Sequence, residues 1–342
     1  LGLNYPKENI RMIQNPTGAA FGYAITPNTY VLCALATLIL GCPCSLELSW
    51  DEFNHMTGKR SATYTNGKLA IDDEGNILAA EYDCGLDHGA YAVVAGKIFN
   101  NLVSVGFHGY NVPNFKGLVR GVATNHAFCC PYRGFGAPQV YTTTEALMDM
   151  AAEKLGIDPW EFRYINAARP GDTALNSEPY YEYVYVDIVE KIKPVYDEYK
   201  AEAEKGKAEG RHTGVGISLG GFLCTIGMFD SCDIAIELNS DNTFTFYNTW
   251  EDLGQGGDIG SLTHAVKALA PMGVKPEQIR LIMNDSLICP DSGVAAASRS
   301  HYMIGNATID GCNRIQAMFK ILLPVAAPGI VTTLIFIFIN AW

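Results

Sequence analysis

Residues 68–83, KLAIDDEGNILAAEYD, place two apolar runs on either side of a short polar stretch. The central DDEGN is typical of a hairpin turn, because Asp, Asn and Gly tolerate tight backbone conformations. A second stretch, CDIAIELNSDNTFTFYNTW at 232–250, predicts another hairpin around Ser-Asp-Asn. Helix-like segments surround the two hairpins without a regular strand–helix alternation. This arrangement favours an α+β fold over a doubly wound sheet.

Caps and apolar spacing place the other elements. Asn28 is a suitable residue to begin a helix and Gly41 a suitable one to end it, and Gly156 ends another apolar pattern. We therefore expect helices at 28–40, 144–155, 159–168, 186–210 and 258–270, and strands at 10–13, 44–50, 214–222 and 279–285.

The composition excludes several classes of function. The chain of 342 residues is 48% hydrophobic and 18% charged, which is long enough and apolar enough for two domains. Its net charge of −12 argues against binding to nucleic acid. The ten cysteines form no Cys-x-x-Cys pair, which favours reduced, buried thiols in a cytoplasmic protein.

Glycine-containing loops carry the candidate chemistry. Each lies between a strand-like and a helix-like segment, and glycine there leaves backbone N–H groups free to bind an anionic or heteroatom-rich ligand. One such loop alone is most often a tight turn, but several together favour one large polar cofactor. The loops are TGAAFGYA at 17–24 (loop 1), YRGFGAPQ at 132–139 (loop 2), DLGQGGDIG at 252–260 (loop 3) and DSGVAAASRS at 291–300 (loop 4). We expect these loops to meet in space.

Longer motifs around these loops resemble a known family. The segments NPTGAAFGYAITPNT, VATNHAFCCPYRGFGAPQ, EALMDMAAEKLGIDPWEFRYINAARPGD, WEDLGQGGDIG and SGVAAASRSHYMIGNA occur in one order along the chain. Together they resemble the molybdopterin-binding subunit of the xanthine oxidase and aldehyde oxidoreductase family, over about residues 4–306. The resemblance implies a cytosine dinucleotide form of the molybdenum cofactor and a homodimer in the full-length relative.

The resemblance also implies a role for each matching position. Loop 1 lies beside the molybdenum ligands, loop 2 holds the pterin, loop 3 hydrogen-bonds the cofactor and loop 4 grips its pyrophosphate. The metal is held by the pterin rather than by side chains. The implied cofactor-binding residues are Phe21, Gly22, Arg133, Gly134, Phe135, Gly136, Gly254, Gln255, Gly256, Ser298, Arg299 and Ser300.

Departures from the family pattern indicate the substrate. Purine-oxidising members carry a Glu where this chain has Ile25, which with Phe135 would line the substrate pocket. An apolar side chain cannot orient a purine, so an aldehyde is the expected substrate. Ala19, Ala24 and Leu253 replace a Gly, a Lys and a His of the family's loops.

The catalytic base of the family has no match. Family members use a Glu in a Gly-x-Gly-Glu motif as the base, and GVGIS at 214–218 has the glycines without the Glu. We therefore assign no catalytic residue, expect no turnover from this chain alone, and expect the [2Fe-2S] clusters that carry electrons away to lie in other domains.

The last segment follows a different pattern. Residues 307–342 resemble the permease subunit of a sugar-type ABC importer, with Gly311 and the Ile-Leu-Leu-Pro run at 321–324, and no charge occurs from Ile321 to Trp342. A run of that length could contact a membrane. We therefore expect an oxidoreductase fragment with subdomains at 1–209 and 210–306, followed by a foreign tail. The alternatives are a transport protein and an inactive chimeric remnant.

Overall fold

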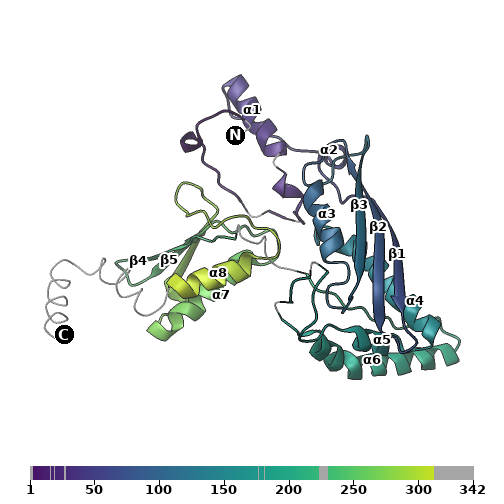
Figure 1. Ribbon diagram of the computed structural model, residues 1–342. Helices are drawn as coiled ribbons and strands as arrows, with labels where there is room; N and C mark the ends of the chain where they lie inside the picture. The colour runs from purple at the N-terminus through teal and green to yellow at the C-terminus, as the bar shows by residue number, and fades with distance from the viewer. Residues whose placement is uncertain are drawn as a thin grey trace. The chain divides into compact units, whose positions relative to one another are not determined.

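The computed structural model describes residues 3–15, 17–18, 20–26, 28–175, 177–180, 182–222 and 230–311. The chain divides into two compact units, coloured in sequence order in Figure 1. The larger unit comprises Gly22–Cys33 and Pro43–Leu223. The smaller unit comprises Leu1–Phe21, Ala34–Cys42 and Cys224–Trp342, and is therefore assembled from separate parts of the chain.

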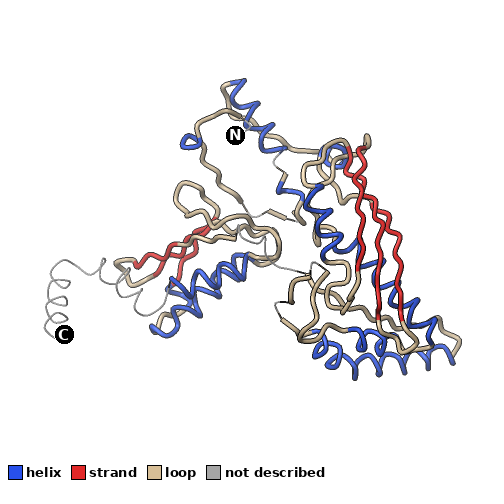
Figure 2. Tube along the Cα trace, viewed as in Figure 1, coloured by secondary structure: helices blue, strands red, loops and turns tan. Residues whose placement is uncertain are grey.

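The larger unit is built around a three-stranded mixed sheet, drawn in red in Figure 2. Strand β2 is central, antiparallel to β1 and parallel to β3. Helices α3 and α4 pack against this sheet, and α5 packs against both α4 and α6. The bounds of these elements are β1 Thr63–Ile71, β2 Ile77–Gly89, α3 Ala95–Ser104, β3 Phe115–Ala123, α4 Ala137–Leu155, α5 Pro159–Asn166 and α6 Tyr185–Ala208.

Side-chain alternation explains why this sheet has one covered face. Successive residues of β1 alternate between half-buried and exposed, as a strand with a single packed face requires. A Cβ atom added to Gly67 would lie 2.6 Å from Leu147 of α4, so the covered face is the one that carries this helix. Tyr82 of β2 stacks on Phe107 with ring centroids 5.0 Å apart and hydrogen-bonds Thr144 of α4.

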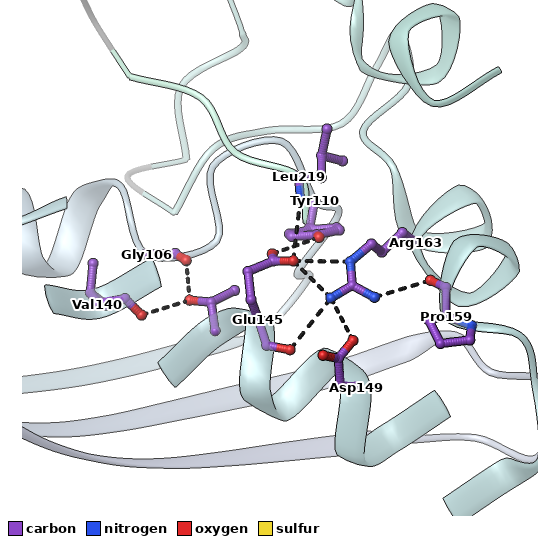
Figure 3. Close-up of polar contacts among 9 residues, drawn as sticks. Gly106, Tyr110, Val140, Glu145, Asp149, Pro159, Arg163 and Leu219 are labelled. Carbon is purple, nitrogen blue, oxygen red and sulfur yellow. Dashed lines mark hydrogen bonds and ion pairs between the residues drawn. The ribbon is translucent and has the colours of Figure 1, made fainter. Parts of the chain in front are cut away.

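A buried ionic network holds α4 in place (Figure 3). The Glu145 carboxylate accepts hydrogen bonds from the Tyr110 hydroxyl at 2.7 Å, from Arg163 Nε at 2.9 Å and from the Leu219 N–H at 3.2 Å. Arg163 is fully buried and also pairs with Asp149 at 2.7 Å. The network therefore ties α4 to α5 and to the segment that follows α6.

The smaller unit contains a second three-stranded mixed sheet with two helices. Strand β5 is central, antiparallel to β4 and parallel to β6. Phe246 and Trp250 lie at its core with Ala265 of α7 and Ile304 of α8. The bounds are β4 Ala235–Leu238, β5 Phe244–Asn248, α7 Gly257–Leu269, β6 Ile279–Met283 and α8 Ser300–Gly311.

The N-terminal segment belongs to this smaller unit. The Arg11 guanidinium pairs with Asp285 at 2.5 Å, and the backbone N–H of Gln14 donates to the Asn284 carbonyl at 2.9 Å. The remaining helices include α1 at Asn28–Leu40, within which the division between the units falls, and α2 at Trp50–Met56. Short 3-10 turns occur at Lys7–Asn9, Tyr23–Ile25, Ala270–Met272 and Pro276–Gln278.

The two units share one order of elements that the sequence does not reveal. Each has a hairpin, then a helix, then a third strand parallel to the second strand of the hairpin. In the larger unit this order is β1, β2, α3 and β3, and in the smaller unit it is β4, β5, α7 and β6. The expected mixture of helices and sheets is confirmed, and so are both hairpins.

Some local predictions were wrong. Residues 10–13 form only an isolated bridge from Ile13 to Asp285, and residues 44–49 and 214–222 form no strand. The helix predicted from 144 begins earlier, at Ala137. The two compact units meet in the chain near residue 223, where residues 219–221 hydrogen-bond to α4, and the subdomain boundary at 209/210 stays a prediction. Among the described helices, none has the length and apolarity needed to cross a bilayer, and 312–342 of the expected permease-like tail lie outside the described residues.

Candidate functional site

Loop 2 is a tight backbone turn at the start of α4. Gly134, Phe135 and Gly136 all have positive φ angles, of 87°, 42° and 102°. A bulky residue rarely adopts this left-handed region, so Phe135 is strained. The turn is closed by the Phe135 N–H, which donates to the Tyr132 carbonyl at 2.7 Å. Arg133 is exposed, and its guanidinium has no partner among the residues that the structure describes.

Side chains from two other elements hold the carbonyl groups of loop 2. Arg60, from the segment before β1, donates through Nη2 to the Arg133 carbonyl and through Nη1 to the Gln139 side chain at 3.2 Å. Its guanidinium also lies 4.7 Å from the centre of the Tyr132 ring. Asn101 of α3 donates from its side-chain amide to the Phe135 carbonyl at 3.0 Å. The loop is therefore fixed before any ligand arrives.

The last part of loop 1, from Gly22, belongs to the larger unit and lies against the start of loop 2. Gly22 has φ +110°, and a Cβ atom there would lie 2.9 Å from the Pro131 carbonyl oxygen. Only glycine fits so close an approach. Phe21, with φ +48°, repeats the aromatic–glycine pair of left-handed residues seen in loop 2. The side chain of Ile25, in the larger unit, is 43% exposed, and that of Phe21, in the smaller unit, is 48% exposed.

Loop 3 is organised by a carboxylate that precedes α7. Asp252 accepts hydrogen bonds from the N–H groups of Gly254, Gly256 and Asp258, at 2.8, 3.3 and 3.1 Å. These N–H bonds lower the pKa of Asp252. Gln255 folds back on its own loop, where its side chain bonds the Leu253 N–H and the Glu251 carbonyl. To reach a cofactor, the Gln255 amide would have to leave these two partners.

Loop 4 leads into α8 and is anchored by Arg299. This guanidinium is only 1% exposed, pairs with Asp230 at 2.6 Å and lies 5.0 Å from the centre of the Trp250 ring. Because the Arg299 guanidinium is buried and bonded within the unit, it is not available to a ligand. Loop 4 would have to bind pyrophosphate through backbone N–H groups and through its serines. Ser298 is exposed with φ +54°, and Ser300 is the first residue of α8.

The helices that follow loops 3 and 4 pack side by side and parallel. A Cβ atom on Gly260 of α7 would lie 1.6 Å from the His301 ring, and one on Gly305 of α8 would lie 2.9 Å from the His264 ring. Each histidine thus fills the gap left by a glycine on the neighbouring helix. Residues 260 and 264 of α7 contact residues 301 and 305 of α8, so moving one turn along α7 also moves one turn along α8. The two helices are therefore parallel, and the dipoles of their N-termini favour an anion at that end.

The site residues therefore form two groups. The larger unit brings together Gly22, Ile25 and loop 2, and the smaller unit brings together loops 3 and 4, through Thr249 and Ser292 at 3.0 Å. The chain passes from one unit to the other between Phe21 and Gly22. That all the loops meet around one ligand stays a prediction.

Three residues that shape these loops were not among the residues predicted from the sequence. Arg60 and Asn101 precede the carbonyl groups that they contact by 73 and 34 residues in the sequence, and no local motif identifies them. Asp252 could have been found, because an acidic residue just before a Gly-rich helix start commonly accepts its free N–H groups.

The described residues include one oriented acid–histidine pair outside the loops. The Asp87 carboxylate accepts from Thr124 at 2.7 Å, from the Gly89 N–H at 2.9 Å and from His126 Nδ1 at 2.6 Å. These hydrogen bonds, led by Thr124, lower the pKa of Asp87 to about 2. No group of three or more His, Cys, Asp or Glu side chains suited to a metal occurs in the part of the chain that the structure describes.

Comparison with known proteins agrees with this loop architecture. Molybdopterin cofactor-binding domain families match residues 1–167 and 191–328, the second match reaching past the joint expected near 307. The aldehyde oxidoreductase of Megalodesulfovibrio gigas is 38% identical over 314 residues, which is 92% of this chain. The chain is homologous to the molybdenum hydroxylases.

Further relatives agree with the assignment to the molybdenum hydroxylases. The structure of the Desulfovibrio desulfuricans aldehyde oxidoreductase matches 90% of this chain with a TM-score of 0.83 and 38% identity. The xanthine dehydrogenase molybdenum-binding subunit of Escherichia coli O157:H7 is 27% identical over 89% of this chain and 41% of its own length. The chain spans only about a third of the two aldehyde oxidoreductases, 35% and 34% of their lengths.

Proposed function

We propose that this chain supplies the cofactor-binding part of a molybdenum-dependent oxidoreductase that converts aldehydes to carboxylic acids. The observation that carries the proposal is the pair of backbone N–H groups in loop 2 that have no hydrogen-bond partner among the described residues. Neither the Gly134 nor the Gly136 N–H has a hydrogen-bond partner among the described residues, although the carbonyl groups beside them are anchored. Unused backbone donors in a glycine turn suit a ligand rich in heteroatoms, such as a pterin.

The residues present fit a pterin dinucleotide in chemical character. Arg133 offers an exposed cation for oxygen atoms of the ligand. The N-terminus of α8 offers donors for a pyrophosphate, whereas Asp252 already accepts N–H groups at the start of α7, and the cytosine dinucleotide form of the cofactor is part of the proposal. When bound, the molybdenum centre supplies a two-electron oxidation in which water provides the oxygen atom.

The substrate proposal rests on an apolar side chain of the larger unit. Ile25 is exposed and offers no hydrogen-bonding group that could orient a purine. An aldehyde carries a small carbonyl and an apolar remainder, and such a surface can accept both. The general base, the iron–sulfur domain that removes electrons and the second copy of a homodimer belong to the proposed whole enzyme.

Metal analysis tests the proposed function. The chain would be produced in a host that makes the pterin dinucleotide, purified and desalted, and its molybdenum and released pterin would be measured. We expect roughly stoichiometric molybdenum and no reduction of dye with aldehydes, since no base has been assigned in this chain. A chain that contains neither metal nor pterin would overturn the proposal, and robust turnover would show that the base lies among the residues present.

The tail carries a narrower proposal. Residues 307–342 contain the uncharged run from Ile321 and the Ile-Leu-Leu-Pro spacing typical of a sugar importer. Because α8 extends to Gly311, we propose that only residues 312–342 are not required by the cofactor-binding fold, and that their apolar surface favours membrane contact or aggregation. Transport by this chain would then not be expected.

A further inference from the structure

Loop 2 depends on two side chains that lie far from it in sequence. Arg60 precedes β1, and Asn101 lies in α3, which follows β2. Each contacts a carbonyl oxygen of loop 2, that of Arg133 or that of Phe135. Neither side chain is required to close the turn, which is already closed by the Phe135 N–H.

Peptide geometry gives these two contacts a directional effect. In a trans peptide the C=O and the following N–H point in opposite directions. Holding the Arg133 carbonyl toward Arg60 therefore aims the Gly134 N–H away from Arg60. Holding the Phe135 carbonyl toward Asn101 aims the Gly136 N–H away from α3 in the same manner. Positive φ at both glycines lets the chain adopt this arrangement.

Glycine makes loop 2 able to turn, but it also makes the peptide planes easy to rotate. Without an anchor on the carbonyl, either plane could flip and present an oxygen atom where a donor is needed. Arg60 is suited to prevent this because its planar guanidinium bonds in two directions and stacks on Tyr132. A lysine ammonium lacks this planar fork, so it would not hold the two acceptors in the same fixed directions.

We propose that Arg60 and Asn101 are positioning residues that aim the Gly134 and Gly136 N–H groups at the bound cofactor. The inference rests on the proposed function, because the ligand of these donors is the pterin cofactor. Neither residue needs to touch the cofactor itself. Their effect is on how tightly the cofactor is held, through the orientation of two peptide planes.

The test compares cofactor content with local and global stability. The full chain and the variants Arg60→Lys and Asn101→Leu would be produced in the same cofactor-making host. Arg120→Lys is the matched control, because Arg120 also makes a two-bond contact, with Asp83, but on the sheet. Loss of a residue that orients a ligand typically weakens binding roughly tenfold, so both loop variants should lose most of their molybdenum under dilution.

Hydrogen exchange separates positioning from general stability. In Arg60→Lys and Asn101→Leu, amide exchange should rise within residues 133–140 while the core of α4 and the melting temperature stay unchanged. Arg120→Lys should retain both its molybdenum and its exchange pattern. Wild-type-like molybdenum retention in both loop variants would overturn the inference while leaving the proposed function intact. An absence of molybdenum in the wild-type chain would overturn the proposed function, and the inference with it.

Discussion

Phe21 and Phe135 each hold an aromatic side chain at positive φ, and each is followed by a glycine that is also left-handed. Such residues cost on the order of 1–3 kcal/mol each and persist only where the surrounding structure fixes them. Phe135 packs partly against the main core, which offsets that cost. The strain falls on two loops of the candidate site, as expected when a backbone is shaped for a ligand.

Replacing Gly134 by Ala should destabilise the larger unit by two mechanisms. Its φ of +87° strains any side chain, and the new Cβ would lie 2.6 Å from the Pro138 ring. Gly156→Ala is the matched control, because Gly156 has φ +68° with no atom within 4 Å. We expect Gly156→Ala to lose about 1 kcal/mol and Gly134→Ala to lose about 1–3 kcal/mol more in urea unfolding. Equal losses would show that loop 2 relaxes around the added atom.

The Asp87 cluster should make stability depend on pH in acid. The pKa of Asp87 is about 2 in the folded state against an ordinary 3.8. Because the folded pKa is the lower one, the stabilisation is present above about pH 4 and is lost as pH falls toward 2. Asp87→Asn should therefore lose about 1–3 kcal/mol at pH 7, and its deficit should shrink in acid.

Thermal unfolding between pH 2.5 and 7 measures this effect. Asp51→Asn is the control, since the Asp51 side chain is 90% exposed on α2. A deficit of Asp87→Asn that stays constant over the whole range would contradict the assignment.

Sequence patterns found the loops but not the residues that shape them. Positive φ at Gly22 and Gly134 could be anticipated, because glycine is the residue that permits it. The contact of Arg60 with loop 2 could not be anticipated in the same way. Arg60 reaches the Arg133 carbonyl only after the sheet has formed. The side chain of Gln255 bonds its own loop, and whether it does so depends on the three-dimensional geometry of that loop.

Among the elements, α4 depends on charges that are buried. Burial raises the pKa of Glu145 while Arg163 opposes that shift. Arg163→Met should leave this carboxylate without its cation, which typically costs about 3–5 kcal/mol. The double variant Glu145→Gln with Arg163→Met should recover part of that loss.

A double-mutant cycle by urea unfolding measures this coupling. Arg280→Met, which breaks an exposed pair with Asp241, should cost less than about 1 kcal/mol. If Arg163→Met costs no more than Arg280→Met, the network shown in Figure 3 does not hold α4.

The packing of α7 on α8 predicts a destabilising substitution and a second substitution that restores stability. Gly260→Ala places a methyl group where the His301 ring now lies, 1.6 Å away, and should separate the two helices. Overpacking of this kind typically costs about 1–3 kcal/mol. Adding His301→Ala should restore most of the lost stability, as followed by circular dichroism during thermal unfolding. A double variant less stable than Gly260→Ala alone would rule out the clash.

Elements with strong local signals were predictable. Both hairpins, α1 with Gly41 at its end and α6 follow from turns, caps and periodicity. The segments at 44–49 and 214–222 alternate like strands yet pair with no sheet, because tertiary contacts decide their conformation. In the second segment, the Tyr141 hydroxyl and Glu145 of α4 take the backbone groups that a neighbouring strand would have used.

At the scale of the whole molecule, the sequence indicates two subdomains but not their composition. A linear reading divides the chain once, whereas the smaller unit also includes residues 1–21 and 34–42. The ion pair of Arg11 with Asp285 is the kind of contact that no local pattern reveals.

Removing residues 312–342 tests the proposal that the tail is not part of this fold. We expect higher solubility and an unchanged melting temperature, because exposed apolar surface costs about 25 cal/mol per Å² and promotes association. Sedimentation and thermal unfolding of the full and shortened chains would measure both. Unfolding of the shortened chain would show that the tail is a core element.

The discontinuous smaller unit has a consequence for biosynthesis. Asp285, the partner of Arg11, is translated 274 residues after it. At ordinary elongation rates that interval is on the order of 15 to 50 s, far longer than a domain of this size needs to collapse. The larger unit can fold during that interval, while the segment around Met12 and Ile13 has not yet met its partner region near Asp285. A nascent chain paused at this stage is thus a natural client for a ribosome-associated chaperone.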